Sequence, residues 1–148
     1  EQTAQRAFDV FFEARNQVKF FSGALEMLSE IKGRYLIFAL TNGNADIEKT
    51  GLDVYMDGAI SAADVSASKP NPEMFKEVLK RTRLYPENAV HIGDNLVDDI
   101  EGASNAGFYS IWVNLKAEKI SKDGAKPNHV VTSLSEISTL LESSATAF

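Results

Sequence analysis

Three aspartates within a stretch of six residues give this chain its clearest candidate for chemistry. Asp94 follows Gly93 at the end of a short apolar run, and Asp98 and Asp99 come four and five residues later. Carboxylates so close together repel one another unless a cation neutralises them. Mg²⁺ suits such a place, because it takes oxygen ligands from one or two protein carboxylates, waters and phosphates. The segment therefore favours a metal site; the alternative is that the acids only complement the positive end of a following helix.

Two further segments carry groups suited to an anion. Thr41 and Asn42 follow an apolar run and precede Gly43, which places a hydroxyl and the N–H groups of a turn at a strand end. Lys69 precedes Pro70, and a proline disfavours a helical conformation in the residue before it, so the lysine is expected in a stiff, extended loop. Taken singly, such a threonine is more often a helix N-cap, and such a lysine is more often a solvated surface residue.

The elements that must position these side chains alternate along the chain. Apolar runs predict strands at residues 35–40, 58–61, 88–92, 108–113 and 129–131. Amphipathic stretches predict helices over about residues 3–16, 24–31, 72–79, 96–106 and 134–141. The run 35–40 lacks a helical period and is expected to be a strand buried on both faces. The alternation indicates an α/β fold with a parallel sheet, in which ligands bind at the carboxyl ends of the strands.

The composition limits the class of protein. With 148 residues, 44% of them hydrophobic and 24% charged, the chain is long enough for one domain with a sizeable core. It has no apolar run of the length that a membrane span needs, no signal-peptide pattern and no cysteine, which is typical of a cytoplasmic protein. The formal net charge of −6 argues against nucleic-acid binding. A phosphorylated ligand would therefore need local positive charge or a metal.

In their order and spacing, the three segments resemble the later motifs of the haloacid dehalogenase superfamily. Residues 40–43 are similar to the second motif, residues 68–70 to the third, and residues 91–99 to the fourth. The resemblance runs from about residue 8 to residue 141 and is strongest to bacterial flavin-mononucleotide phosphatases with a helical cap. It implies a Rossmann-like core and a magnesium-dependent phosphatase that acts on a small phosphorylated metabolite through an aspartyl-phosphate. Flavin mononucleotide and sugar or nucleotide phosphates are the substrates that it suggests.

The resemblance also implies a role for each candidate residue. Thr41 and the main chain of Asn42 would hold phosphate oxygens, and Lys69 would neutralise the nucleophile and the transferring phosphoryl group. Asp94 would bind Mg²⁺ directly. Asp99 would be the second metal acid, because it directly precedes the Ile-x-Gly-Ala sequence of the family pattern; Asp98 is the alternative.

One part of the family pattern is not found. The first motif, an apolar strand ending in Asp-x-Asp, carries the nucleophile, but the only early aspartate is Asp9, which lies in a helical pattern with Phe11 where the second aspartate should be. Residues 1–17 instead resemble the end of a helical cap and its hinge, and residues 18–148 an incomplete core. The loss of the central strand would leave two unpaired strand edges. We expect a rearranged segment or a partner chain, such as a second copy, to cover them.

Two other interpretations stay open. One is a metal-independent 2-haloacid dehalogenase, which the aspartate cluster disfavours, because that branch usually has neutral residues there. The other is an inactive fragment that acts only in assembly, and the chain alone is expected to lack activity. His91 is expected to be a hydrogen-bonded core histidine and not a catalyst.

Overall fold

The computed structural model describes residues 2–43, 45–121 and 124–144 and has an alternating α/β order. Side chains are described for fewer residues than that near the two ends of the chain. In chain order the elements are α1 (Gln2–Asn16), α2 (Ala24–Ile31), β1 (Phe38–Thr41), α3 (Ile47–Thr50), β2 (Gly58–Ser61), α4 (Ala62–Val65), α5 (Pro72–Thr82), η1 (Pro86–Asn88), β3 (Val90–Gly93), η2 (Leu96–Glu101), α6 (Gly102–Asn105), β4 (Tyr109–Val113), β5 (His129–Val131) and α7 (Ser135–Ser144).

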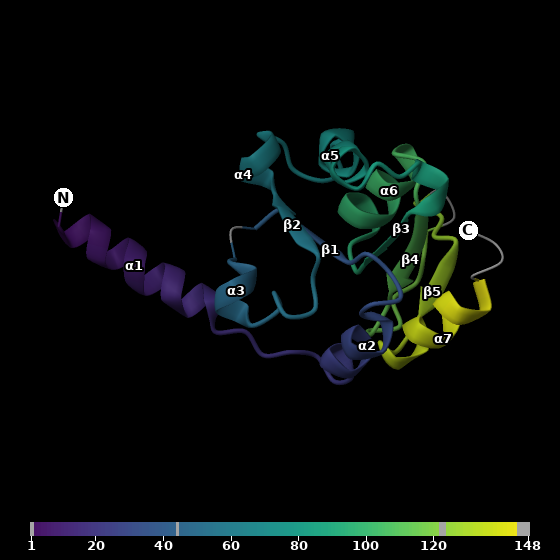
Figure 1. Ribbon diagram of the computed structural model, residues 1–148, viewed down its shortest axis with the longest axis horizontal. Coiled ribbons are helices and arrows are strands. Elements are labelled where there is room, and N and C mark those ends of the chain that lie inside the picture. The colour runs from purple at the N-terminus through teal and green to yellow at the C-terminus, as the bar shows by residue number, and fades with distance from the viewer. Residues whose placement is uncertain (1, 44, 122–123, 145–148) are drawn as a thin grey trace.

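The strands form two parallel sheets. β1 pairs with β2 in one sheet, and the other sheet has the order β3-β4-β5. Helices α5 and α6 cover one side of the strands, while α2 and α7 lie on the other (Figure 1). The prediction of an α/β fold with parallel strands is confirmed. The strands do not form one continuous sheet, however, because β1 and β3 are not hydrogen-bonded to each other.

The predicted strand at residues 35–40 was wrong in its start and in its burial. β1 begins at Phe38, and its four residues are half-buried. Leu36, before the strand, keeps 60% of its surface exposed. The reason is the sheet topology: β1 pairs with β2, and within the described ranges no strand lies on its other side, so that edge is not covered as the edge of a central strand would be.

Two apolar clusters hold these layers together. One joins α2 and α7 to the β3-β4-β5 sheet and contains Met27, Ile111, Val131 and Leu141. The second cluster lies under α5 and includes Met74 and Phe75 of that helix. Helix α5 begins after Asn71, whose side chain accepts the N–H of Glu73, and a proline occupies its first turn. Its Met74 and Phe75 are fully buried, which stabilises the fold by about 1.5–3 kcal/mol for each side chain.

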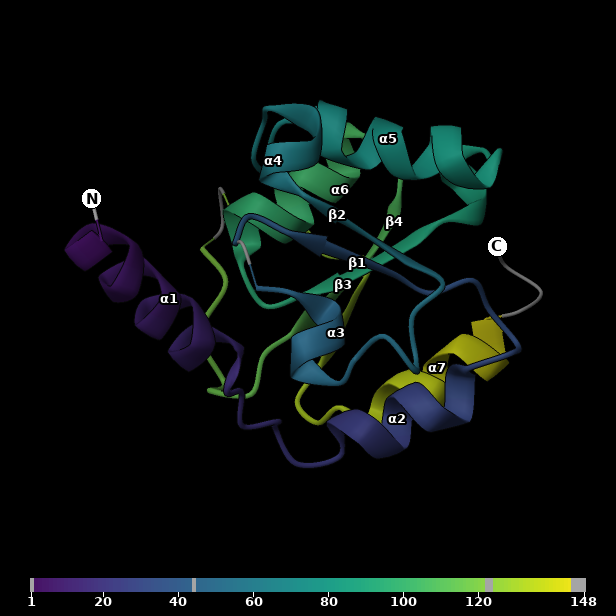
Figure 2. The same ribbon diagram turned by 60° about the vertical axis from the view of Figure 1, so that its left-hand side comes forward.

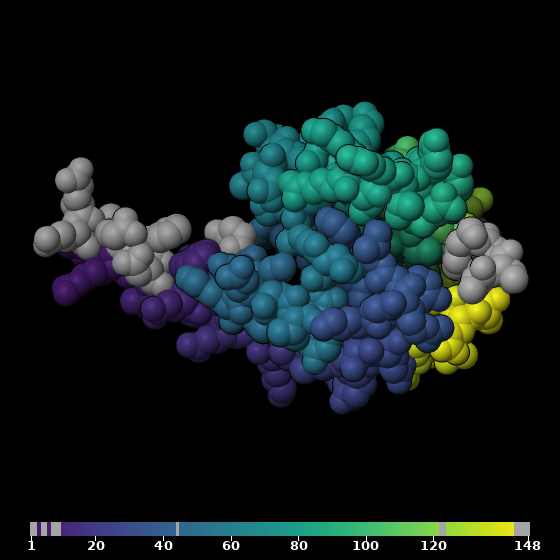
Figure 3. Space-filling model, in the orientation of Figure 1, coloured from purple at the N-terminus to yellow at the C-terminus, as the bar shows by residue number. Residues whose placement is uncertain are grey.

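Helix α1 projects from the rest of the molecule (Figures 1 and 3). Its last residue, Asn16, is buried and connects it to the domain: its Nδ2 donates to the Phe12 carbonyl at 2.8 Å, and its Oδ1 accepts the Asp46 N–H at 2.8 Å. The division at residue 17 between a cap remnant and a core stays a prediction. Among the helices in the described ranges, none is long and apolar enough to cross a membrane.

Candidate active site

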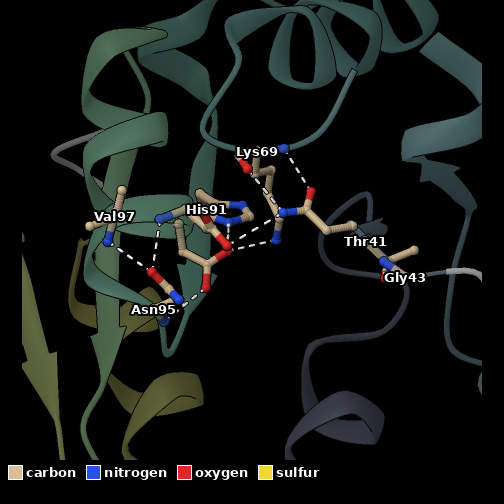
Figure 4. A network of polar contacts seen from close by, with 9 residues as sticks. Thr41, Gly43, Lys69, His91, Asn95 and Val97 are labelled. Carbon is tan, nitrogen blue, oxygen red and sulfur yellow. Dashed lines mark hydrogen bonds and ion pairs between the residues drawn. The ribbon is translucent and has the colours of Figure 1, made fainter. Parts of the chain in front are cut away.

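The carboxyl ends of β1 and β3 meet in one network of polar contacts (Figure 4). Asn42 follows β1, Lys69 lies in the loop before α5, and Asp98 and Asp99 lie on η2 after β3. Asn42 Nδ2 is 3.4 Å from Asp98 Oδ2, and Lys69 Nζ is 2.6 Å from Asp99 Oδ1. The fold thus brings together four of the side chains that the sequence singled out, from three separate segments.

Asp99 is the buried centre of this network. Only 5% of its surface is exposed. Its Oδ1 accepts from Lys69 Nζ and lies 3.0 Å from His91 Nε2, and its Oδ2 accepts the Asn95 N–H at 3.0 Å. The Lys69 side chain is almost as well shielded, so the pair is a buried salt bridge with further hydrogen bonds. Removing one partner of such a pair is strongly destabilising, because the other charge is left buried.

The surroundings of Asp99 keep it ionised. Burial raises the pKa of its carboxyl group, but the hydrogen bonds from His91, Lys69 and the Asn95 N–H, together with the charge of Lys69, outweigh burial. The resulting pKa lies well below the usual range of an aspartate. Asp99 is therefore a carboxylate at any pH at which the protein is expected to work.

A glycine and an asparagine turn Asp99 back toward the strand end. Asn95 is the N-cap of η2, and its Oδ1 accepts the N–H groups of Val97 and Asp98, each at 2.9 Å. The Asp99 carboxylate packs against Gly93, where a Cβ would collide with it. The strand-to-helix segment is thus built so that Asp99, four residues after the cap, folds over the end of β3.

Asn42 and Thr41 have roles that the sequence did not indicate. The Asn42 side chain bonds both main-chain groups of Lys69: its Oδ1 accepts the N–H at 2.6 Å, and its Nδ2 donates to the carbonyl at 3.0 Å. The Thr41 hydroxyl oxygen accepts the Gly43 N–H at 2.9 Å. Thr41 is not the N-cap of α3, because Asp46 is. Both side chains therefore shape the loops at the site.

His91 is held as expected, although its partner was not foreseen. The imidazole faces Asp99 on one side and packs edge-on against Phe75, with ring centroids 5.1 Å apart. Only 11% of its side chain is exposed. The alternation of side chains along β3 could have predicted that His91 faces Asp99, because it places His91 on the same face of the strand as Gly93, against which Asp99 packs.

The three acids differ in how they could hold a cation. Asp94 is exposed and Asp98 is half-buried, and among the described residues neither forms an ion pair. Both oxygens of Asp99 are engaged by protein groups. Within the described ranges, no group of three acidic or histidine side chains is arranged to hold a metal ion. Asp94 and Asp98 fit a hard cation in charge and ligand type, whereas Asp99 already forms an ion pair with Lys69.

Replacing Gly93 with alanine is expected to lower the free energy of unfolding by about 3 kcal/mol, because the new methyl group displaces Asp99 from Lys69. Urea denaturation measures the change. Gly124→Ala is the matched control: its nearest neighbour would be the Ser121 carbonyl oxygen at 3.4 Å, an ordinary contact, and the expected change is within about 1 kcal/mol of zero. Equal stabilities of the two variants would show that the close contact at Gly93 is not needed.

Comparisons with known proteins agree on the family. Residues 2–107 match the family of haloacid dehalogenase-like hydrolases. The pyrimidine 5'-nucleotidase YjjG of Escherichia coli is 32% identical over 125 residues, which is 80% of this chain and 55% of that protein. The (S)-2-haloacid dehalogenase 2 of a Pseudomonas species is 31% identical over 123 residues, 80% of this chain and 52% of that protein. This chain thus spans about half the length of these relatives.

A solved structure extends the agreement to the fold. The 2-haloacid dehalogenase of Pseudomonas syringae is 34% identical, superposes with a TM-score of 0.91, and is matched over 96% of this chain and 61% of that one. The match of residues 2–107 covers most of the chain and includes every residue of the network at the ends of β1 and β3. The chain therefore belongs to the haloacid dehalogenase-like hydrolase family.

Proposed function

We propose that this chain belongs to a magnesium-dependent phosphatase that acts on a small phosphorylated metabolite through an aspartyl-phosphate. Membership of the hydrolase family supports hydrolysis as the class of reaction. Among the relatives are enzymes named as phosphatases and enzymes named as haloacid dehalogenases, so the choice between them rests on the site.

The observation that carries the choice is the excess of negative charge at the ends of the strands. Lys69 pairs with Asp99, and Asp94 and Asp98 lie on the same short segment with no ion pair to any residue that the structure describes. A dehalogenase acting on a carboxylate substrate gains nothing from two further negative charges beside that substrate. A divalent cation would neutralise them and draw a phosphate group to the site.

Each of the site residues would then have its own role in phosphoryl transfer. Mg²⁺, held by Asp94 with Asp98 or Asp99, would neutralise the negative charge of the phosphoryl group. Lys69, an ammonium group with three donors on a loop fixed by Asn42, would stabilise the charge of the nucleophile and of the transferring group. The Thr41 hydroxyl and the turn after β1 would orient phosphate oxygens. These are positioning and electrostatic effects, which supply most of the catalysis in phosphoryl transfer.

No Asp-x-Asp sequence, the family's nucleophile motif, occurs in these 148 residues. We therefore expect the chain alone to hydrolyse neither p-nitrophenyl phosphate nor flavin mononucleotide, and the chain joined to a preceding strand that ends in Asp-x-Asp to hydrolyse at least one of them when Mg²⁺ is present. Phosphate release with and without a chelator is the measurement. Turnover by the chain alone, abolished in Lys69→Ala, would place the nucleophile within these residues and contradict the proposal.

A metal-independent 2-haloacid dehalogenase is the second candidate. The specific observation in its favour is that Asp99, buried and paired with Lys69, needs no cation to be stable as a carboxylate. Chloride release from L-2-chloropropionate in the presence of a chelator separates the two. Release that continues without metal, from a protein that leaves phosphate esters intact, would establish the dehalogenase.

A further inference from the structure

The indole of Trp112 reaches the end of the neighbouring strand at the site. Trp112 lies on β4, opposite Gly93 of β3, and only 2% of its surface is exposed. Figures 1 and 2 both show the two strands side by side. Trp112 Nε1 donates to the main-chain carbonyl of Asp94 at 2.9 Å. Because Asp94 lies one residue beyond the paired register of β3 and β4, the indole extends the hydrogen bonding of the sheet to a candidate metal acid.

The peptide group between Asp94 and Asn95 is held at both ends. Its carbonyl accepts from Trp112, and its N–H, which belongs to Asn95, donates to Asp99 Oδ2 at 3.0 Å. Asp99 in turn forms the buried ion pair with Lys69. Hydrogen bonds in such a series polarise one another, so a donor on the carbonyl strengthens the bond that the N–H gives. One peptide group thus connects Trp112 with the Lys69–Asp99 pair.

The simplest explanation of the bond is that a buried indole N–H needs an acceptor. The place of the acceptor argues for more than that. Asp94 is exposed, and the peptide group after it is the joint at which the chain leaves β3 and enters η2. An acid whose main chain is fixed loses less freedom when it binds a cation, which is why groups that orient metal ligands matter for affinity.

We propose that Trp112 is a positioning residue of the site, which fixes the peptide group between Asp94 and Asn95 and through it orients the two acids Asp94 and Asp99. Its effect on Asp99 does not depend on which reaction the site performs. Its effect on a cation at Asp94 rests on the proposed function. The role is indirect, because the indole N–H bonds the main chain and the ring is buried.

Hydrogen exchange of the Asn95 amide, followed by NMR, tests the proposal without a metal. Trp112→Phe keeps an aromatic ring but removes the N–H. In this variant of the 148-residue chain we expect the Asn95 amide to exchange at least tenfold faster, because its peptide group is then held only by Asp99. The Asp57 amide, which donates to the Ile37 carbonyl at 2.7 Å beside the β1–β2 sheet, is the internal reference and should change less than twofold.

Two further proteins separate the hydrogen bond from the packing of the ring. Tyr35→Phe is the matched control, since it also removes one donor to a main-chain carbonyl, that of Leu141 at 3.2 Å, away from the site. It should leave the exchange of the Asn95 amide within twofold. Because the chain has a single tryptophan, benzothienylalanine, which has sulfur in place of the indole N–H, can replace Trp112 where Trp112→Phe fails to fold. An Asn95 amide that exchanges at the parent rate in this protein would overturn the proposal.

Binding of Mn²⁺, which takes the same oxygen ligands as Mg²⁺, separates this inference from the proposed function. In the chain joined to an Asp-x-Asp strand, the free ion is measured by electron paramagnetic resonance. We expect the Kd for Mn²⁺ to rise at least fivefold in Trp112→Phe and to stay within twofold in Tyr35→Phe. Faster exchange of the Asn95 amide with an unchanged Kd would mean that the indole only supports the fold, and the proposal would be wrong. A parent protein that binds no Mn²⁺ contradicts the phosphatase, and the exchange of the Asn95 amide then decides the inference alone.

Discussion

Lys69→Ala and Asp94→Asn are each expected to lower kcat/KM for a phosphate ester at least a hundredfold in the chain joined to an Asp-x-Asp strand. Each change removes one preorganised electrostatic contact with the transferring phosphoryl group or its metal, worth about 3–4 kcal/mol in a site shielded from water. Steady-state kinetics at saturating Mg²⁺ measure the effect, with circular dichroism to confirm folding. Near-normal rates in both variants would rule out the phosphatase.

The same kinetics identify the second metal acid. If Asp99 acts mainly by holding Lys69, Asp99→Asn lowers both kcat and the free energy of unfolding. The Mg²⁺ concentration that gives the half-maximal rate then changes little. Asp98→Asn then raises that concentration, since Asp98 is half-buried beside Asn42 and has no ion pair in the described structure. The opposite pattern would support Asp99 as the metal acid that the family resemblance implies.

Asp99→Asn is also expected to lower the free energy of unfolding of the 148-residue chain at pH 7 by about 3–5 kcal/mol. The neutral amide leaves the ammonium group of Lys69 buried without its partner. The double variant Lys69→Met/Asp99→Asn should recover part of the loss, because it removes the orphaned charge. Thermal or urea denaturation of the three proteins measures this coupling.

The difference between the parent chain and Asp99→Asn should depend on pH in a defined direction. The pKa of Asp99 in the folded chain is lower than in the unfolded chain, so the unfolded state binds more protons at low pH. The contribution of Asp99 is therefore complete above about pH 5 and decreases as the pH falls through and below about 4, the ordinary value of an aspartate. A difference that stayed constant from pH 7 to pH 3 would be inconsistent with a buried, ion-paired Asp99.

The exposed pair of Glu73 and Lys76 supplies the control. Their charged atoms are 2.7 Å apart, but more than half of each side chain is exposed. Solvent screens such a pair, so Glu73→Gln should change the free energy of unfolding by less than about 1 kcal/mol. A loss as large as that of Asp99→Asn would mean that burial is not what makes the Lys69–Asp99 pair strong.

Local signals in the sequence determined where the elements and the site candidates lie. The apolar run before Gly93, the cap residue Asn71 and the proline after it each act through their own or adjacent residues, and the structure has β3 and α5 at those places. The rule that parallel strands present ligand sites at their carboxyl ends then placed Asn42 and the aspartates in one region, and the family resemblance added Lys69 to them. Fold class and the location of the network could be predicted for that reason.

Only the tertiary structure decided which partner each side chain takes. Lys69 and Asp99 are 30 residues apart, and Asn42 and Lys69 are 27 apart. No local pattern encodes such contacts, because they depend on how β1, β3 and the loop before α5 come together. The sequence left Asp98 and Asp99 as alternatives. In the structure the close packing at Gly93 directs Asp99 into the buried pair with Lys69, while Asp98 stays half-buried beside Asn42. The division into two sheets is likewise a property of the whole arrangement, since each strand edge is paired or unpaired according to its neighbours in space and not in the chain.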